Sequence, residues 1–266
     1  KDKNDVFTIK AYDFMTNFDI DVAPWLNELT FPITLKDFID DLADYCGIEE
    51  VDYKSAPNQT LSIQKFTANS VSGRQLLKYA SQATGRFLRV IGSGVLSFNN
   101  YSADSSVTLD SSLYTELNLN DFETPAITGL WIGKEDGDVG VTAGTDTNQY
   151  RIYNNPMLFN CTSTAAQNIL NEIKNRAYYG GTVKLRKSTW RDANNQLKWI
   201  NPGFMITVDG KTFLVMEMSN DNKGFTLKEA MVACEYIFGA SESLLSYNPQ
   251  ANTLVVAYGH GGDGAK

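Results

Sequence analysis

Residues 72–98 read SGRQLLKYASQATGRFLRVIGSGVLSF, and a helical pattern gives way to a strand pattern within them. Ser72 suits the N-cap of a helix, and Gly85 is placed to end it. Beyond that glycine, residues 87–91 and 95–98 are strand-like runs on either side of a Gly-Ser-Gly turn. Between cap and stop, four apolar residues recur at helical spacing: Leu76, Leu77, Ala80 and Ala83. The segment therefore predicts a helix that leads into a β-hairpin.

An earlier segment repeats this plan. Thr34 can cap a helix over residues 35–46 that Gly47 is placed to end. An offset of 38 positions superposes Thr34 on Ser72 and Gly47 on Gly85. We therefore predict two related strand–helix units in the first hundred residues.

The second half of the chain predicts one helix and several closely spaced strands. The helix covers residues 165–177, with its cap among Thr162 to Thr164 and its end at Gly180-Gly181. Asp209-Gly210 between two strand-like runs is a strong hairpin signal. Further strand-like runs lie at 127–132, 182–186, 204–208, 211–216, 225–227 and 230–236. Short antiparallel strands with tight turns are typical of a small β-barrel.

Composition excludes several classes of protein. The 266 residues carry 23 Lys and Arg against 31 Asp and Glu, a net charge of −8, and no run of basic residues exceeds two. We therefore expect no nucleic-acid binding site and no attraction to anionic membranes. The apolar windows are too short for a transmembrane span, and the N-terminal stretch does not resemble a signal peptide.

The residues that catalysis and metal binding require are sparse. His260 is the only histidine, and Cys46, Cys161 and Cys234 are far apart. Metal ligands in the usual spacing and the base of a Ser or Cys triad are therefore missing, so we nominate no catalytic, cofactor-binding or metal-binding residue and expect no enzyme. The three cysteines are interpreted as small buried thiols.

Other features have two readings each. Residues 136–138 and the Asp146/Asn148 pair offer oxygen ligands, but they lack the spacing of an EF-hand calcium loop, so solvated turns are favoured. Trp25, Trp190 and Trp199 suit either sugar stacking or, as we favour, anchoring in a core or a subunit interface. Three Asn-x-Ser/Thr sequons, at Asn58, Asn100 and Asn160, matter only in a glycosylating pathway.

The order of these pieces resembles a known series. It runs from residues 7–15 (FTIKAYDFM), through the helix that ends in residues 45–48 (YCGI), to residues 73–87 and the Gly-Ser-Gly hairpin. Ile132-Gly133, residues 155–158 (NPML) and the segment from Pro202-Gly203-Phe204 to Gly224-Phe225-Thr226 continue it. The chain resembles, over residues 6–236, the tail-hub proteins of bacteriophages and prophages, a family that includes siphophage tail-associated proteins and the baseplate hubs of contractile tails.

This resemblance implies an α+β fold of two tail-tube-like antiparallel β-barrels, with an α/β segment of two strand–helix units inserted between them. It implies a structural hub without enzymatic role or cofactor, assembled in the bacterial cytoplasm into the virion tail. The partners would be other tail proteins and the chain itself, as a homotrimer in the full-length protein. Family members begin their first barrel upstream of the strand at Val6, so we expect this chain to be part of a longer polypeptide.

The implied division of the chain has five parts. Residues 1–20 would be the final strand or strands of a truncated first barrel, 21–100 the inserted α/β segment and 101–124 a connection. Residues 125–240 would form the second β-barrel with one helix, and 241–266 a linker-like C-terminal tail.

An alternative from another class of function is a carbohydrate-binding adhesin module with Trp190 and Trp199 on a sugar-facing sheet. A cell-wall hydrolase ranks third, because the metal ligands, or the nucleophile and base, that such an enzyme requires are missing.

Overall fold

A computed structural model describes most of the residues of the chain. These are residues 7–11, 14–91, 94–100, 107–134, 139–174, 176–187, 189–191, 194–200, 203–215, 217–221, 224–228, 241–248 and 253–260. None of the helices among them is long and apolar enough to cross a membrane.

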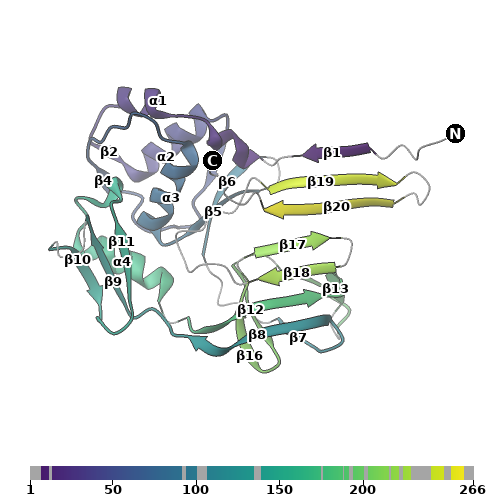
Figure 1. Cartoon of the computed structure of the whole chain (residues 1–266). Coiled ribbons are helices and arrows are strands. Elements are labelled where there is room, and N and C mark those ends of the chain that lie inside the picture. Colours follow the sequence, from purple (N-terminus) through teal and green to yellow (C-terminus); the bar gives the residue numbers. More distant parts are fainter. Residues whose placement is uncertain are drawn as a thin grey trace.

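The first part of the fold is a small helical layer beside a three-stranded sheet (Figure 1). Its helices are η1 (Phe14–Asp19), α1 (Ala23–Glu28), α2 (Leu35–Tyr45) and α3 (Gly73–Thr84). The sheet has the order β3-β6-β5, with β6 (Val95–Asn99) parallel to β3 (Glu50–Asp52) and antiparallel to β5 (Phe87–Ile91). β2 (Ile33–Thr34) lies directly before α2, and β4 (Ser62–Ile63) lies after β3. The two strands pair as a short antiparallel ribbon.

The caps predicted for both helices are present. The Thr34 hydroxyl accepts a hydrogen bond from the Asp37 backbone N–H at 3.1 Å, and the Ser72 hydroxyl accepts one from Gln75 N–H at the same distance. Gly85 follows α3 with a φ of 67°, the left-handed conformation that a glycine adopts without strain. The two capped helices are therefore found where the sequence predicts them, and β5 and β6 form the predicted hairpin.

A second layer of strands joins this unit. β9 (Gly129–Gly133) lies between antiparallel β10 (Val141–Gly144) and parallel β11 (Gln149–Tyr153), and η2 (Pro156–Leu158) leads into α4 (Ser163–Ile173). α4 packs on β9, β10 and α3. Thr162 provides its cap, as predicted, but the helix ends at Ile173, well before Gly180-Gly181.

A seven-stranded sheet occupies the later part of the chain. Its order is β17-β18-β12-β16-β15-β7, with β8 (Tyr114–Thr124) also paired to β12 (Tyr178–Leu185). The other strands are β17 (Glu217–Asp221), β18 (Gly224–Lys228), β16 (Lys211–Leu214), β15 (Met205–Val208) and β7 (Thr108–Leu109). The Asp209-Gly210 turn joins β15 and β16 with positive φ at both residues, the geometry of a tight hairpin. Among the described strands the pairing does not return to its start, so the predicted closed barrel is not confirmed.

A further antiparallel sheet pairs strands from near the two ends of the chain. β1 (Phe7–Ala11), the strand predicted near the N-terminus, pairs with β19 (Ser241–Asn248), which pairs with β20 (Thr253–His260). The sequence predicted a linker-like tail for residues 241–266, whereas two strands form there. Residues 254–257 (LVVA) favour a strand, and the glycines that follow masked that signal.

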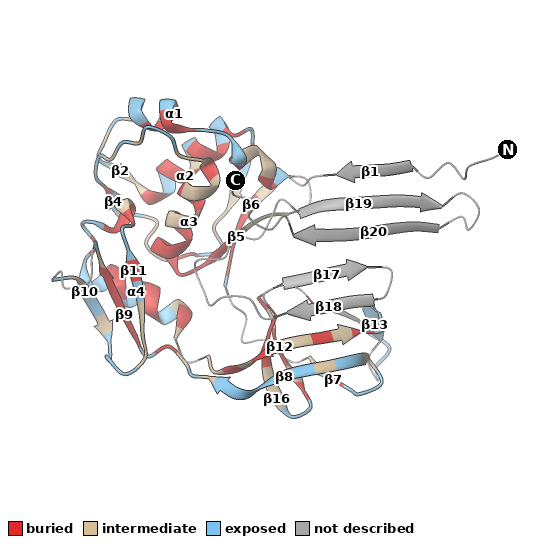
Figure 2. Ribbon diagram, in the orientation of Figure 1, coloured by how far each residue is buried: buried red, intermediate tan, exposed pale blue. Residues whose placement is uncertain are grey.

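Two hydrophobic cores lie between the helices and sheets of residues 14–215 (Figure 2). The larger one combines side chains of α2, α3 and β6 with those of β9, β11 and α4. The smaller one lies against the seven-stranded sheet and is centred on Val183, Ile206 and Phe213, which are fully buried. The larger core runs across position 125, where the sequence placed a domain boundary, and that division remains a prediction.

Candidate functional site

The outer edge of the seven-stranded sheet is formed by β8, an eleven-residue strand. The sequence predicted only a polar connection at 101–124, and this prediction is wrong for Tyr114–Thr124. Leu117 and Leu119 pack on the smaller core while Glu116 and Asn118 are exposed, which is the alternation of a half-buried strand. Between Tyr114 and Phe122 these leucines are the only apolar residues among acids, amides and a threonine, so the sequence signal is weak. Among the described strands β12 is the one partner of β8, which leaves its other edge open (Figure 2).

A bulge interrupts the pairing of β8 with β12. Leu119 is opposite Gly181 and Glu123 is opposite Tyr179, so three residues of β8 face a single residue of β12. Gly181 has a φ of 133°, and a Cβ there would lie 2.1 Å from the Asn118 carbonyl oxygen. Gly181, which the sequence predicts as part of a helix end, therefore lets two strand backbones approach closely instead.

The bulge presents an aromatic side chain to solvent. Phe122 lies within it and is 84% exposed. Its neighbours Asp121 and Glu123 are exposed as well. By contrast, Glu116 at the start of the strand contacts Lys184, with 3.3 Å between Nζ and Oε1. We call residues 121–123 the acidic tip.

A hollow of about 600 Å³ lies near the start of the same strand. The turn before β8 is fixed to the segment after β12 by a 2.9 Å hydrogen bond from Arg186 N–H to the Leu113 carbonyl. A short hairpin of β13 (Thr189–Arg191) and β14 (Leu197–Trp199) supplies the rest of the wall. Three cations and two leucines dominate the lining, which consists of Ser112, Leu113, Arg186, Lys187, Thr189, Arg191 and Leu197. We call this hollow the basic pocket.

The basic pocket has both charge and apolar surface. No acid is among the described residues that line it. Leu197 is 51% exposed, and Arg191 is oriented by a 2.7 Å hydrogen bond from Nη1 to the Asn195 carbonyl. Such a site can accept an apolar group that carries negative charge beside it.

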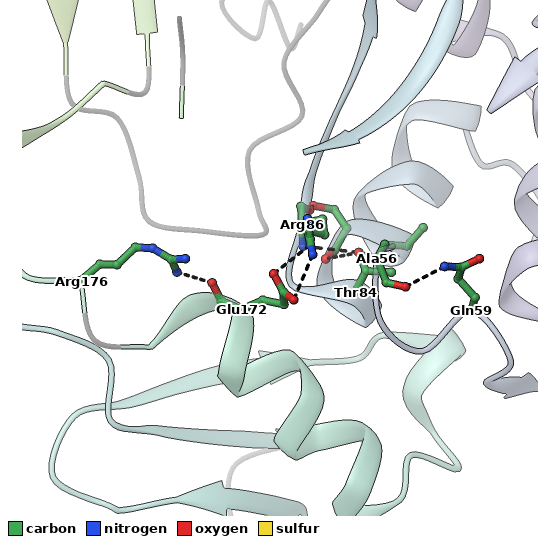
Figure 3. A network of polar contacts seen from close by, with 8 residues as sticks. Ala56, Gln59, Thr84, Arg86, Glu172 and Arg176 are labelled. Carbon is green, nitrogen blue, oxygen red and sulfur yellow. Dashed lines mark hydrogen bonds and ion pairs between the residues drawn. The ribbon is translucent and has the colours of Figure 1, made fainter. Parts of the chain in front are cut away.

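The contact between α3 and α4 gives the first part of the chain a rigid frame (Figure 3). Arg86 forms a two-pronged ion pair with Glu172, at 2.8 Å from Nε to Oε2 and 3.1 Å from Nη2 to Oε1. Arg176 Nη1 donates to the Glu172 carbonyl. A Cβ on Gly85 would lie 2.9 Å from the Ile169 carbonyl oxygen and from Cβ of Glu172, so the glycine is what allows α4 to pack this closely.

Two of the three cysteines have buried thiols, as the sequence predicts. Cys46 and Cys161 are buried, and burial raises their pKa to about 12 and about 11, so both are protonated and unreactive at neutral pH. Cys234 and residues 136–138 lie outside the described residues. Among those described, no group of three His, Cys, Asp or Glu side chains could hold a metal ion.

Asn148, of the Asp146/Asn148 pair, forms hydrogen bonds that fix the segment before β9. The Asn148 side-chain amide donates to the carbonyls of Pro125 and Ala126, at 3.0 and 2.9 Å. Asp146 accepts a 3.4 Å hydrogen bond from the Gln149 side chain. Asn148 therefore fixes the segment that leads from β8 into β9.

The sequon asparagine Asn58 is used inside the molecule. Its amide donates to the carbonyls of Ala83 and Ala165 at 2.9 and 3.0 Å, and it accepts from Asn168 at 3.0 Å. The residue thus ties the end of α3 to the start of α4.

The three tryptophans with two possible roles lie in two parts of the fold. Trp25 packs against Phe38 and Tyr45, with ring centroids 5.4 and 5.7 Å apart, in agreement with the core interpretation. Trp190 is paired with Lys198, and Trp199 with Thr189, in the β13–β14 ladder. The register therefore brings the two tryptophans to neighbouring positions of one short hairpin.

Comparison with known proteins gives structural neighbours only. No family model matches the chain, and no curated protein matches it. The solved structures that are similar to it include two tail proteins. One is the tail protein from Neisseria meningitidis MC58, at 14% identity and a TM-score of 0.45, covering 76% of this chain and 68% of that one. The other is the 43 kDa tail protein of prophage MuSo2 from Shewanella oneidensis, at 15% identity and a TM-score of 0.46, covering 86% and 76%. Both are tail proteins.

Proposed function

We propose that this chain is a structural component of a bacteriophage or prophage tail tip, a hub that connects the tail tube to distal tail proteins. It acts through protein–protein interfaces, has no catalytic role, and belongs to the virion tail. The full-length protein assembles as a homotrimer.

The observation that carries the proposal is the order of the elements that underlie the sequence resemblance. The helix capped by Thr34, the helix capped by Ser72 and the β5–β6 hairpin follow one another and share one core. The acidic tip and the basic pocket add exposed surfaces of opposite charge. Exposed apolar groups beside charge are typical of interaction sites.

The first test is the mass in solution of this chain, and of one extended upstream of Lys1, by light scattering across a concentration series. A trimer of either chain supports the hub. Monomers of both lengths contradict it, and glycan binding that is lost in Trp190→Ala would then favour the adhesin module.

The absence of catalysis is tested separately. We expect purified cell wall to remain intact after prolonged incubation with the chain. Release of soluble wall fragments above the level of a heat-treated sample would contradict a purely structural role.

A further inference from the structure

Two surfaces of opposite charge, the acidic tip and the basic pocket, lie at opposite ends of β8. The basic pocket adjoins Leu113, directly before the strand, and Phe122 lies close to its end. At about 3.3 Å per residue, and allowing for the bulge, roughly 25 Å separates them. The two surfaces of one rigid strand cannot meet within one molecule.

We propose that the acidic tip of one copy of this chain inserts into the basic pocket of the next copy. The Phe122 side chain would lie between Leu113 and Leu197 of the pocket. Asp121 and Glu123 would pair with the cations of the rim, which are Arg186, Lys187 and Arg191. This inference rests on the proposed structural role and names the surface through which copies contact one another.

Charge complementarity identifies a second copy as the occupant. The tip carries two carboxylates around one aromatic ring, and the lining of the pocket carries three cations and two leucines. The ring also gains from a guanidinium placed over its face, because the π-system attracts cations. An aromatic anchor in a pocket with charged pairs at its rim is the usual arrangement of an energetically important contact.

The backbone around the tip is built to present it. The close approach of Asn118 and Gly181 requires a glycine, and it produces the bulge in which Phe122 is 84% exposed. Phe122 is the most exposed aromatic side chain among the described residues, and its place on a bulge at a sheet edge makes the whole ring available as a binding anchor. The bulge also interrupts the open edge of β8, which disfavours non-specific strand pairing.

The contact is head-to-tail. When one tip enters one pocket, the pocket of the first copy and the tip of the second remain free. Such a heterologous interface closes into a ring if its rotation allows and otherwise continues as a filament. The open edge of β8 would lie at the inter-copy interface.

The experiment is a concentration series by sedimentation velocity at low and high salt. Phe122→Ala, the tip reversal D121K/E123K and the pocket reversal R186E/R191E should each weaken association at least tenfold. Phe159→Ala, at a 47% exposed ring in the other part of the molecule, and D44K/E49K, at two exposed acids there, should leave association unchanged. High salt should weaken association of the parent chain, because the contact is charged.

Mixing tests direct pairing. The tip-reversed chain keeps an intact pocket, and the pocket-reversed chain keeps an intact tip. Each alone should be monomeric, and the mixture should associate. Unchanged circular dichroism and thermal unfolding of each variant show that folding is intact.

The outcomes separate the interface from the wider role. If the parent chain assembles and the tip and pocket variants assemble equally well, this interface is wrong. The proposed hub role is then unaffected. A parent chain that is monomeric at both lengths overturns both. If association of both variants is weakened and their mixture does not associate either, the direct pairing of tip and pocket is also wrong.

Discussion

At the scale of single residues, glycines and buried charges determine how closely the elements pack. Gly85 and Gly210 both have positive φ, at 67° and 72°. A Cβ on Gly85 would meet α4 at 2.9 Å, whereas a Cβ on Gly210 would meet nothing within 4 Å. Substitutions at these two glycines therefore distinguish the cost of backbone strain alone from the cost of strain plus a steric clash.

We expect Gly210→Ala to lower the free energy of unfolding by about 1 kcal/mol, because only the left-handed conformation is strained. Gly85→Ala should cost clearly more, about 3 kcal/mol, because α4 must also move away. Urea denaturation of both variants measures the difference. Equal losses would show that α4 does not pack on this glycine.

The Arg86–Glu172 pair gives a second prediction at this scale. The Arg86 side chain is 9% exposed and that of Glu172 is 22% exposed. Glu172→Gln should lower the free energy of unfolding by about 3 kcal/mol, because it leaves a buried guanidinium without its counter-charge. The matched control is Glu116→Gln, where the carboxylate is 64% exposed and pairs with Lys184, and we expect a loss of less than about 1 kcal/mol. A loss from Glu172→Gln no larger than the control's would contradict a structural ion pair.

At the scale of elements, α3 shows how an amphipathic pattern becomes a core contact. Leu77 is fully buried in the larger core, while Lys78 next to it is half-buried. We expect Leu77→Ala to lower the free energy of unfolding by about 2 to 5 kcal/mol through lost burial and a cavity. Lys78→Ala should change it by less than about 0.5 kcal/mol. A loss below about 1 kcal/mol for Leu77→Ala would show that this stripe is not core.

The elements that the sequence predicted best have local causes. Thr34 and Ser72 satisfy backbone N–H groups within three residues, and Asp209-Gly210 forms its turn from its own φ preferences. β8 escaped prediction because its apolar residues face the core only through pairing with β12. Gly180-Gly181 was misread because a glycine pair signals a helix end and a strand bulge equally well.

At the scale of the whole molecule, the described residues form two hydrophobic cores, and we expect a substitution in one to leave the other unaffected. Phe213 is fully buried in the smaller core and does not belong to the larger one. We expect Phe213→Ala to cost about 3 to 5 kcal/mol locally. Hydrogen exchange should then accelerate in peptides of β15 and β16 and stay unchanged in α2, because stability is not uniform across a structure. An equal acceleration in both regions would show one cooperative unit.

The sequence by itself determined the mixed α and β class, the two capped helices, the hairpins at residues 87–98 and 205–214, and the buried Cys46 and Cys161. These features follow from side-chain chemistry within a few residues or from one periodic pattern. The tertiary structure alone decided that residues 114–124 form an edge strand, that α4 packs on Gly85, and that Phe122 and the basic pocket lie at opposite ends of β8. Each of these depends on pairing or packing between segments far apart in the chain, and no local pattern encodes which distant backbone will be the partner.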